Sequence, residues 1–322
     1  MEKINWGIVG PGIIAHEFAA DFEYVSNGRL VAVASRTQDK AKEFASQYNI
    51  PKAYGSYEDL YSDPDIQAIY VATPHSFHHQ NTIDALSSGK AVLCEKPLAI
   101  SPDESMEMIR VAQKHNNYLM EGMWTYFLPA IRKAKEWVDQ GRIGKIVNLK
   151  SDFGYPVPFD PNNRMYKAEL AGGSLYDMGI YTLAMALLFY ENEPIRKILL
   201  GRFFTKGVDN DVTMLFEYQD AVATLTSAFR CKLPNFTHII GEEGYIEIPD
   251  FWRARKCSFY KLEECIDVFE DGRSSNGFNY EIDAASKDIL EGRLQSETVP
   301  WATSLKLQQQ LYSIKEEINN KT

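Results

Sequence analysis

A glycine-rich turn between a short apolar strand and a helix constrains the fold of this chain most strongly. The apolar run 4–9 leads directly into Gly10–Ala15, which reads GPGIIA. Gly10 permits a tight turn, Gly12 leaves room for a pyrophosphate beside the backbone, and Ala15 allows close packing of the helix on the strand. The pattern predicts a dinucleotide site at a helix start, although an ordinary strand–helix turn is the alternative.

A second landmark is the continuous apolar run 91–94, which is followed at once by Glu95 and Lys96. A run of this length without alternation is typical of a parallel strand buried on both faces. Pro97 cannot donate to a sheet ladder, so the strand must end there. Because ligands lie beyond the carboxyl ends of such strands, Lys96 is a candidate for the ligand crevice. The alternative is a solvated charge paired with Glu95.

The order of the remaining segments predicts two domains. Strands and helices alternate up to residue 122, which indicates an N-terminal Rossmann domain, 1–122, with a doubly wound parallel sheet. The rest, 123–322, is expected to be an α+β domain for substrate binding and dimerisation, with a large, mostly antiparallel open sheet. Its expected strands are 145–153, 195–204, 211–218, 221–229, 236–241 and 245–248. A C-terminal helix, 304–318, is a candidate for packing back on the first domain.

Composition excludes several classes of partner. The chain has 322 residues and a formal net charge of −10, which disfavours nucleic acids and anionic membranes. Its four cysteines form no regular spacing, which suits a reducing cytoplasm. The first residues run directly into a strand, so no signal peptide is expected, and no apolar run approaches the length that spans a membrane.

The end of the second expected strand, 29–34, bears on the choice of cofactor. An NAD site usually places a carboxylate here for the ribose 2′-hydroxyl, whereas a 2′-phosphate needs a cation and hydroxyl donors. The strand is followed by Ser35, Arg36 and Thr37, and no carboxylate stands nearer than Asp39. We therefore expect NADP in preference to NAD; the alternative is that Arg36 is merely a solvated residue at a helix start.

Three histidines occur on a helix that is expected to begin with Thr73 as N-cap and Pro74 at the first helical position. His75, His78 and His79 have the spacing of one helix face. No cysteine or paired carboxylate accompanies them, so a metal site is not expected. By position, His78 is a candidate neighbour of the cofactor.

The second half contains one further motif, Ala171–Tyr181, which reads AGGSLYDMGIY and opens a long apolar helix to residue 190. Asp177 and Tyr181 are four residues apart on this expected helix and would share a face. Because the helix is nearly all apolar, it should be buried. A buried aspartate must be paired or functional.

Together, the GPGIIA turn, Glu95-Lys96-Pro97 and the glycine-rich motif around Asp177 resemble the Gfo/Idh/MocA oxidoreductase family. The resemblance extends over essentially the whole chain. Within the family, residues 120–124, 163–166 and Tyr181 are most similar to the branch of dimeric dihydrodiol dehydrogenases and NADP-dependent D-xylose dehydrogenases. Inositol dehydrogenases carry histidine where this chain has Tyr181, which disfavours an inositol substrate.

The resemblance implies roles for three residues. Lys96 would be the catalytic lysine, Asp177 the carboxylate that holds the substrate hydroxyl, and Tyr181 the acid/base. A phenol has a pKa of about 10, which is too high for a base at neutral pH. A nearby ammonium lowers that pKa by stabilising the phenolate.

The resemblance and the motifs also imply binding residues. The expected cofactor-binding residues are Gly10, Gly12, Ile13, Ile14, Ser35, Arg36, Thr37, Thr73, Pro74, His78, Glu95 and Lys96. The expected substrate-binding residues are Trp124, Phe153, Arg164, Asp177 and Phe278. Core packing is an equally good explanation for each of the aromatic side chains.

The function expected from these features is NADP-dependent hydride transfer involving a hydroxyl-bearing carbon of a sugar, cyclic polyol or trans-dihydrodiol. A first alternative is NADPH-dependent reduction of a keto sugar such as 1,5-anhydrofructose, since no sequence feature fixes the direction. A second is a non-catalytic NADP-sensing regulatory protein. Such a protein should have lost Lys96, Asp177 or Tyr181, and all three are present.

The C-terminal sheet also predicts a homodimer. Alternation in the strands 212–216 and 222–226 turns one set of side chains to a covered face and leaves a mixed set on the other. Ile239, Phe251 and Trp252 are expected to add apolar area nearby. A partly apolar open face rarely stays exposed on a monomer, and a two-fold interface is the commonest solution. Loops or the C-terminal helix could cover this face instead.

Overall fold

The computed structural model describes residues 2–190 and 192–320, and the chain divides into two compact units. The first unit consists of residues up to 124 together with 274–308. The second consists of 125–273 together with the residues from 309 onward. This division differs from the expected second domain, 123–322, because a C-terminal stretch returns to the first unit.

The first unit is built on a six-stranded parallel sheet, in the order β3-β2-β1-β4-β5-β6. Its strands are β1 (Ile4–Val9), β2 (Gly28–Ala34), β3 (Lys52–Tyr54), β4 (Ala68–Val71), β5 (Ala91–Glu95) and β6 (Leu119–Gly122). Every residue of β4, β5 and β6 is buried, as the continuous apolar runs predict. The expected Rossmann architecture is confirmed.

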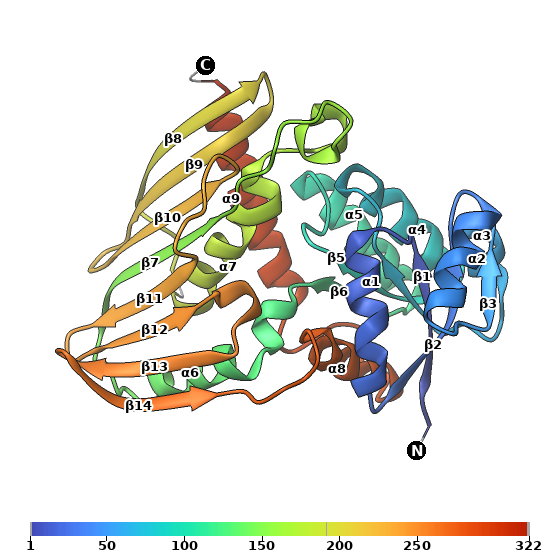
Figure 1. The fold of residues 1–322 in the computed structure, drawn as a ribbon, viewed down its shortest axis with the longest axis horizontal. Helices are drawn as coiled ribbons and strands as arrows, with labels where there is room; N and C mark the ends of the chain where they lie inside the picture. The colour runs from blue at the N-terminus through green and yellow to red at the C-terminus, as the bar shows by residue number, and fades with distance from the viewer. Residues whose placement is uncertain (1, 191, 321–322) are drawn as a thin grey trace. The chain divides into compact units, whose positions relative to one another are not determined.

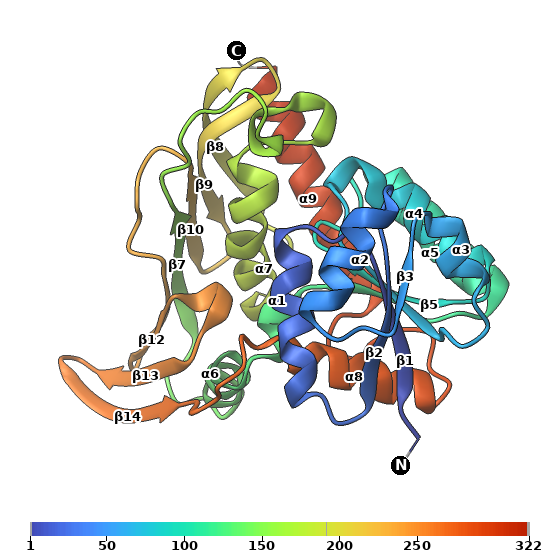
Figure 2. The same ribbon diagram turned by 45° about the vertical axis from the view of Figure 1, so that its right-hand side comes forward.

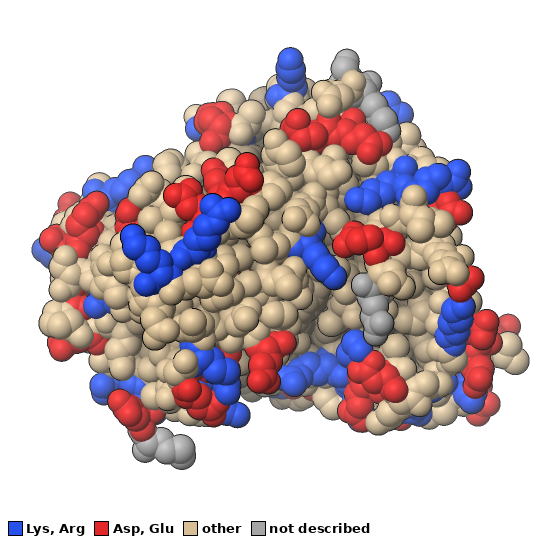
Figure 3. Space-filling view, turned by 180° about the vertical axis from the view of Figure 1, so that it is seen from behind, with Lys and Arg blue, Asp and Glu red and all other residues tan. Residues whose placement is uncertain are grey.

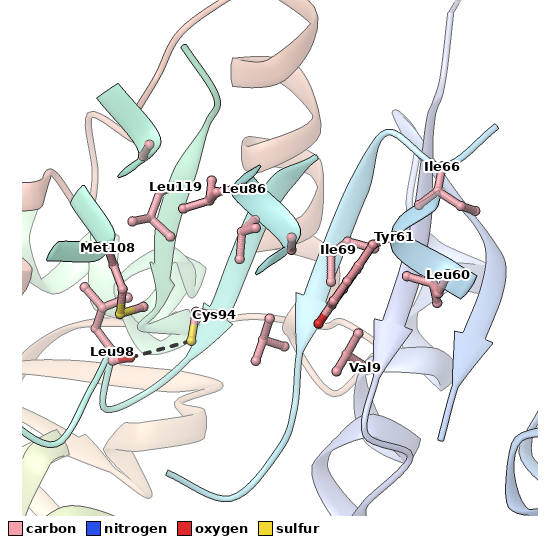
Figure 4. Close-up of a cluster of buried hydrophobic side chains, with 14 of the residues drawn as sticks. Val9, Leu60, Tyr61, Ile66, Ile69, Leu86, Cys94, Leu98, Met108 and Leu119 are labelled. Atoms are coloured by element: carbon pink, nitrogen blue, oxygen red, sulfur yellow. Dashed lines mark hydrogen bonds between the residues drawn. The ribbon is translucent and has the colours of Figure 1, made fainter. Parts of the chain in front are cut away.

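Helices cover both faces of this sheet (Figure 1). They are α1 (Ile13–Ala20), α2 (Gln38–Gln47), α3 (Tyr57–Ser62), α4 (His78–Ser87), α5 (Pro102–His115) and α8 (Phe278–Leu290). Figure 4 shows one core cluster, in which Leu60 of α3, Leu86 of α4 and Met108 of α5 lie over the sheet strands. On α1, Phe18 packs edge-on against Trp6 of β1 and Phe278 of α8.

Two features of this unit differ from the sequence prediction. The helix expected to begin at Pro74 instead starts as a 3₁₀ turn, His75–Phe77, before α4 begins at His78. Helix α8 was not predicted, and it is tied to the first unit by a buried carboxylate. Asp21 accepts hydrogen bonds from the backbone N–H groups of residues 276 to 279, so it caps the start of α8.

The second unit contains an eight-stranded sheet in the order β14-β13-β12-β11-β7-β10-β9-β8. Only the β7–β10 pair is parallel among the described strands of this sheet. The strands are β7 (Ile146–Gly154), β8 (Arg196–Thr205), β9 (Val208–Glu217), β10 (Val222–Ala228), β11 (Phe236–Gly241), β12 (Tyr245–Pro249), β13 (Lys256–Lys261) and β14 (Glu264–Glu270). The expected mostly antiparallel sheet is confirmed.

The last two strands were not predicted. The turn between β13 and β14 contains Leu262, whose φ is 52°. Such backbone usually selects glycine or asparagine, so the sequence lacks the ordinary signal of a hairpin. Strand β14 is also largely exposed, and its charged residues hide the alternation that marks a half-buried strand.

The helices of the second unit lie on one face of its sheet. They are α6 (Pro129–Asp139), α7 (Ile180–Phe189) and the C-terminal part of α9 (Trp301–Asn319). Figures 1 and 2 show these helices on one face, and none of the described helices of this unit covers the other. The side chains of Val212, Met214 and Phe216 are buried on the helix-covered face, as the alternation predicts.

The opposite face is partly apolar. Ile198 and Leu200 on β8 and Leu215 on β9 are exposed, and Ile198 pairs directly with Leu215. Ile239 and Phe251, which were expected to add exposed apolar area, are fully buried instead. This correction follows from their places: Ile239 points to the covered face, and the ring of Phe251 packs edge-on against Phe153.

Candidate functional site

A pocket of about 240 Å³ opens in the first unit where β1, β2 and β4 end. Its lining residues are Gly10, Pro11, Gly12, Ser35, Arg36, Lys40, Tyr57, Ala72, Thr73, Pro74, Phe77 and Asn81. Six of the residues expected to bind the cofactor are therefore together here: Gly10, Gly12, Ser35, Arg36, Thr73 and Pro74. The others, namely Ile13, Ile14, Thr37, His78, Glu95 and Lys96, are not among the lining residues.

The glycines of the turn have the geometry that a dinucleotide site requires. Gly10 has a φ of +89°, and a Cβ there would lie 3.0 Å from Cγ2 of Thr73. At Gly12 the nearest atom to an added Cβ would be 3.9 Å away, so the backbone at the start of α1 stays open. Backbone N–H groups at a helix start, together with Arg36 and Lys40, suit a phosphate group.

Sequence reasoning missed Lys40 and Tyr57 as pocket residues. Lys40 lies in the first turn of α2, and Arg36 precedes that helix. Burial raises the pKa of the Tyr57 phenol, and the charge of Arg36 opposes this rise. Tyr57 therefore stays neutral at physiological pH beside two cations.

His78 links the segment after β4 to the segment after β5, next to this pocket. It is fully buried; its Nδ1 lies 2.7 Å from the carbonyl oxygen of Pro97, and its Nε2 lies 2.8 Å from that of Thr73. His79 instead lies at the surface, 3.0 Å from Glu107. Among the described residues, no group of three His, Cys, Asp or Glu side chains could hold a metal ion.

Lys96 follows β5 in a setting rich in carboxylates. Its backbone N–H lies 3.2 Å from Oε2 of Glu95, and Glu95 also accepts a hydrogen bond from the Tyr70 hydroxyl. The peptide bond between Lys96 and Pro97 is cis. Glu121 lies at the end of β6, where its Oε1 accepts a hydrogen bond from the backbone N–H of Leu98 at 2.8 Å.

Two buried acids in this unit have raised pKa values. Burial raises the pKa of Glu121 to about 7, although hydrogen bonds and the charge of Lys96 oppose it. Burial and the charge of Glu95 raise the pKa of Glu281 well above its ordinary value. The rings of Trp124 and Phe278, both expected at the substrate, are stacked with centroids 4.5 Å apart.

The second unit contains Asp177, buried and paired with a cation. Arg164, in the 3₁₀ turn Arg164–Tyr166, approaches it with two nitrogens: Nη2 lies 3.0 Å from Oδ1 and Nη1 lies 3.3 Å from Oδ2. Such a two-point pair fixes the orientation of the carboxylate. Two candidates from the sequence, Arg164 and Asp177, are therefore direct neighbours.

The helix that carries Asp177 is not the continuous α-helix that the sequence predicts. Leu175–Gly179 forms a π-helical turn, and α7 begins only at Ile180. The simple four-residue relation between Asp177 and Tyr181 therefore does not describe their backbone. Such π turns are rare and occur frequently at functional sites.

Tyr181 is buried on α7 and contacts a second aromatic candidate. The ring of Phe153 on β7 lies edge-on to Tyr181, with centroids 5.6 Å apart. Phe153 also stacks on Trp252, with centroids 4.2 Å apart. Trp252 was expected on the dimer face and was missed as a neighbour of this pair.

On the face seen in Figure 3, Lys and Arg side chains are interspersed with Asp and Glu, without a continuous basic surface among the described residues. None of the helices in residues 2–190 and 192–320 combines the length and apolar character needed to cross a bilayer.

The chain is similar to known oxidoreductases along most of its length. The model of an oxidoreductase family with an NAD-binding Rossmann fold, Gfo/Idh/MocA, matches residues 4–123, and that of the Gfo/Idh/MocA C-terminal domain matches residues 131–247. A trans-1,2-dihydrobenzene-1,2-diol dehydrogenase of Mus musculus is 34% identical, covering 94% of this chain and 92% of that protein. One from Xenopus laevis is 35% identical, covering 93% of each.

A solved structure is also similar over its full length. The aldose-aldose oxidoreductase of Caulobacter crescentus, complexed with glycerol, has a TM-score of 0.90 and 26% identity. The match covers 100% of this chain and 99% of that one.

The raised pKa of Glu121 predicts a pH-dependent stability. The unfolded carboxyl ionises near its ordinary value of 4.5 and the folded one near 7, so the folded state binds more protons between these values. Stability should therefore fall as pH rises through this window. Glu121→Gln should remove this pH-dependent loss of stability. The difference in unfolding free energy between Glu121→Gln and the parent should therefore shift in favour of the variant by roughly 1–3 kcal/mol from pH 4.5 to pH 8.

Urea unfolding at both pH values measures this effect. Glu43→Gln, at an exposed position of α2, is the control and should show no such change. An equal difference between Glu121→Gln and the parent at both pH values would contradict the assignment.

Proposed function

The chain belongs to the Gfo/Idh/MocA family of oxidoreductases, and from this premise we propose that it is an NADP-dependent dehydrogenase of sugars, cyclic polyols or trans-dihydrodiols. The resemblance drawn from its motifs is confirmed, and so is its assignment as an NAD(P)-dependent oxidoreductase acting on CH–OH groups. The choice of NADP, the substrate class and the residue roles are the proposal.

The pairing of Asp177 with Arg164 is the observation that carries the substrate class. A buried carboxylate accepts hydrogen bonds from hydroxyl groups, and the guanidinium beside it donates them. A diol or sugar offers neighbouring hydroxyls that can both donate and accept. The matched relatives, which are named for a dihydrodiol and for aldoses, act on compounds with adjacent oxygens, and this supports the same class here.

The proposed chemistry uses three side chains. Bound NADP supplies the hydride acceptor. Tyr181 removes the proton of the substrate hydroxyl as general base, and Asp177 accepts a hydrogen bond that orients the substrate. Lys96 is the proposed catalytic lysine, because an ammonium lowers the pKa of a phenol that acts as the base. Trp124 and Phe278 in the first unit, and Phe153 in the second, are the proposed aromatic residues of the substrate site.

The preference for NADP is supported by the charge of the pocket. Arg36 and Lys40 line it together with the hydroxyl of Ser35, and no carboxylate is among its lining residues. A 2′-phosphate is an acceptor with negative charge, whereas the 2′-hydroxyl of NAD calls for a carboxylate. The pocket thus fits the phosphorylated cofactor better.

A homodimer and a cytoplasmic location are also part of the proposal. The exposed Ile198, Leu200 and Leu215 form an apolar patch on the face of the second sheet that lacks helices. A second copy of the chain packed on this patch would remove it from water by a self-complementary contact. The four cysteines are all free, which suits a reducing compartment.

The cofactor assignment predicts the effect of removing both pocket cations. Arg36→Ala combined with Lys40→Ala should raise the KM for NADP at least tenfold and leave the KM for NAD nearly unchanged, because only NADP carries the 2′-phosphate. Initial rates with each cofactor measure this. Lys42→Ala, exposed on the same helix but absent from the pocket, is the matched control. A parent enzyme that prefers NAD tenfold would refute the assignment.

The residue roles predict two kinetic phenotypes. Lys96→Met should abolish turnover and leave NADP binding largely intact, because the pocket lining does not include Lys96.

Tyr181→Phe should remove the base and flatten the pH–rate profile. Steady-state kinetics and cofactor titration by fluorescence separate the two effects. Full activity with an unchanged pH dependence in Tyr181→Phe would mean that the base lies elsewhere.

The apolar patch predicts the mass of the particle in solution. Light scattering at micromolar concentration should give twice the chain mass of 36.7 kDa. Leu200→Asp places a charge on the patch, where the Leu200 side chain is 68% exposed, and should yield monomers. Leu262→Asp, at a position 90% exposed in the β13–β14 turn, should stay dimeric. A monomeric parent would defeat the dimer proposal.

A further inference from the structure

A fully buried aspartate binds the start of the π-helical turn in the second unit. Oδ2 of Asp209, on β9, accepts hydrogen bonds from the backbone N–H of Leu175 at 2.7 Å and from the Ser174 hydroxyl at 2.8 Å. A buried carboxylate is costly unless donors surround it. The donors that Asp209 uses here belong to the turn that carries Asp177.

The other oxygen of the same carboxylate is held by the C-terminal helix. Nζ of Lys315, on α9, lies 2.6 Å from Oδ1 of Asp209, and both side chains are buried. The Lys315 ammonium also lies 5.5 Å from the ring centroid of Tyr176, within the π turn. The ion pair therefore contacts three consecutive residues of the turn, 174 to 176.

The surrounding backbone leaves this turn little freedom. Gly173 has a φ of +120°, and a Cβ there would lie only 2.4 Å from Oδ1 of Asp209. The hydroxyl of Ser174 also lies 3.0 Å from that of Ser227. At the far end of the turn, a Cβ on Gly179 would lie 3.1 Å from the Ser227 hydroxyl. The start of the turn thus lies against β9 and β10, and its far end lies against β10.

We propose that the buried Asp209–Lys315 ion pair is a positioning device that holds the π turn in the conformation that aims Asp177 at Arg164. A π turn is intrinsically less favourable than an α-helix, so it persists only where its surroundings determine it. Asp177 is two residues beyond Leu175, whose N–H binds Asp209. Loss of that anchor lets the turn rewind toward α-helix and rotates Asp177 away from its partner.

This assignment rests on the proposed function, in which Asp177 orients the substrate. Asp209 and Lys315 are positioning residues, because they act through the turn. The pair differs from a salt bridge that only stabilises the fold, because it also affects catalysis. Its loss should affect turnover by more than the loss of a salt bridge elsewhere in the same unit.

The test removes both charges together, so that no unpaired charge is left buried. Asp209→Asn combined with Lys315→Met should lower kcat at least tenfold for a sugar or diol that the parent oxidises. NADP affinity should stay within twofold, because the cofactor pocket lies in the first unit.

Lys315→Arg keeps the charge and should retain at least a third of kcat. Asp209→Asn alone, which is isosteric, should also lower kcat if the double variant fails to fold.

A matched control isolates positioning from stability. Arg142 and Asp267 form an ion pair at 2.7 Å in the same unit. Arg142→Met combined with Asp267→Asn should leave kcat within twofold of the parent. For Asp209→Asn with Lys315→Met, or for Asp209→Asn alone, a kcat within twofold of the parent would overturn the proposal, even if the protein were less stable.

Hydrogen exchange supplies a readout that does not depend on activity. The amides of residues 174–179 should exchange at least tenfold faster in the Asp209 variants, while those of β9 residues 212–217 stay unchanged. Unchanged exchange in 174–179 would also overturn the proposal. If the parent oxidises no substrate, the proposed function fails, and exchange alone then decides whether the pair holds the turn.

Discussion

Buried carboxylates that must find donors determine much of the local structure in both units. A carboxylate out of water is tolerated only where several donors converge on it. Asp21 holds the start of α8, Glu121 binds the backbone after Lys96, and Asp209 binds the π turn. Each of these acids fixes a stretch of backbone that carries a candidate functional side chain. Asp177 is held in the same way by Arg164.

Much of the first unit could be predicted from sequence because its signals are local. Continuous apolar runs predict β4 and β5, and the two glycines predict the turn before α1. The return of α8 could not be predicted, because it depends on Asp21, which lies some 250 positions earlier. The β13–β14 hairpin was not predicted, because Leu262 occupies a turn position at which glycine is the usual residue.

The candidate site was predicted as a set of residues rather than as contacts. The sequence singled out Trp124, Phe278, Phe153 and Tyr181 individually, and the structure shows the first two stacked and the last two edge-on. The π turn at Asp177 was missed because residues distant in sequence impose it, chiefly Asp209. Nothing within AGGSLYDMGIY distinguishes such a turn from ordinary helix.

We propose that this oxidoreductase transfers hydride between NADP and a hydroxyl-bearing carbon of a sugar or diol. The most direct test is a screen of aldoses including D-xylose, cyclic polyols and trans-dihydrodiols. The absorbance of NADPH monitors the reaction. We expect at least one of these compounds to reduce NADP to NADPH, and to do so faster than it reduces NAD to NADH. NADP binding without turnover in either direction would refute the proposed activity and indicate a cofactor-sensing protein.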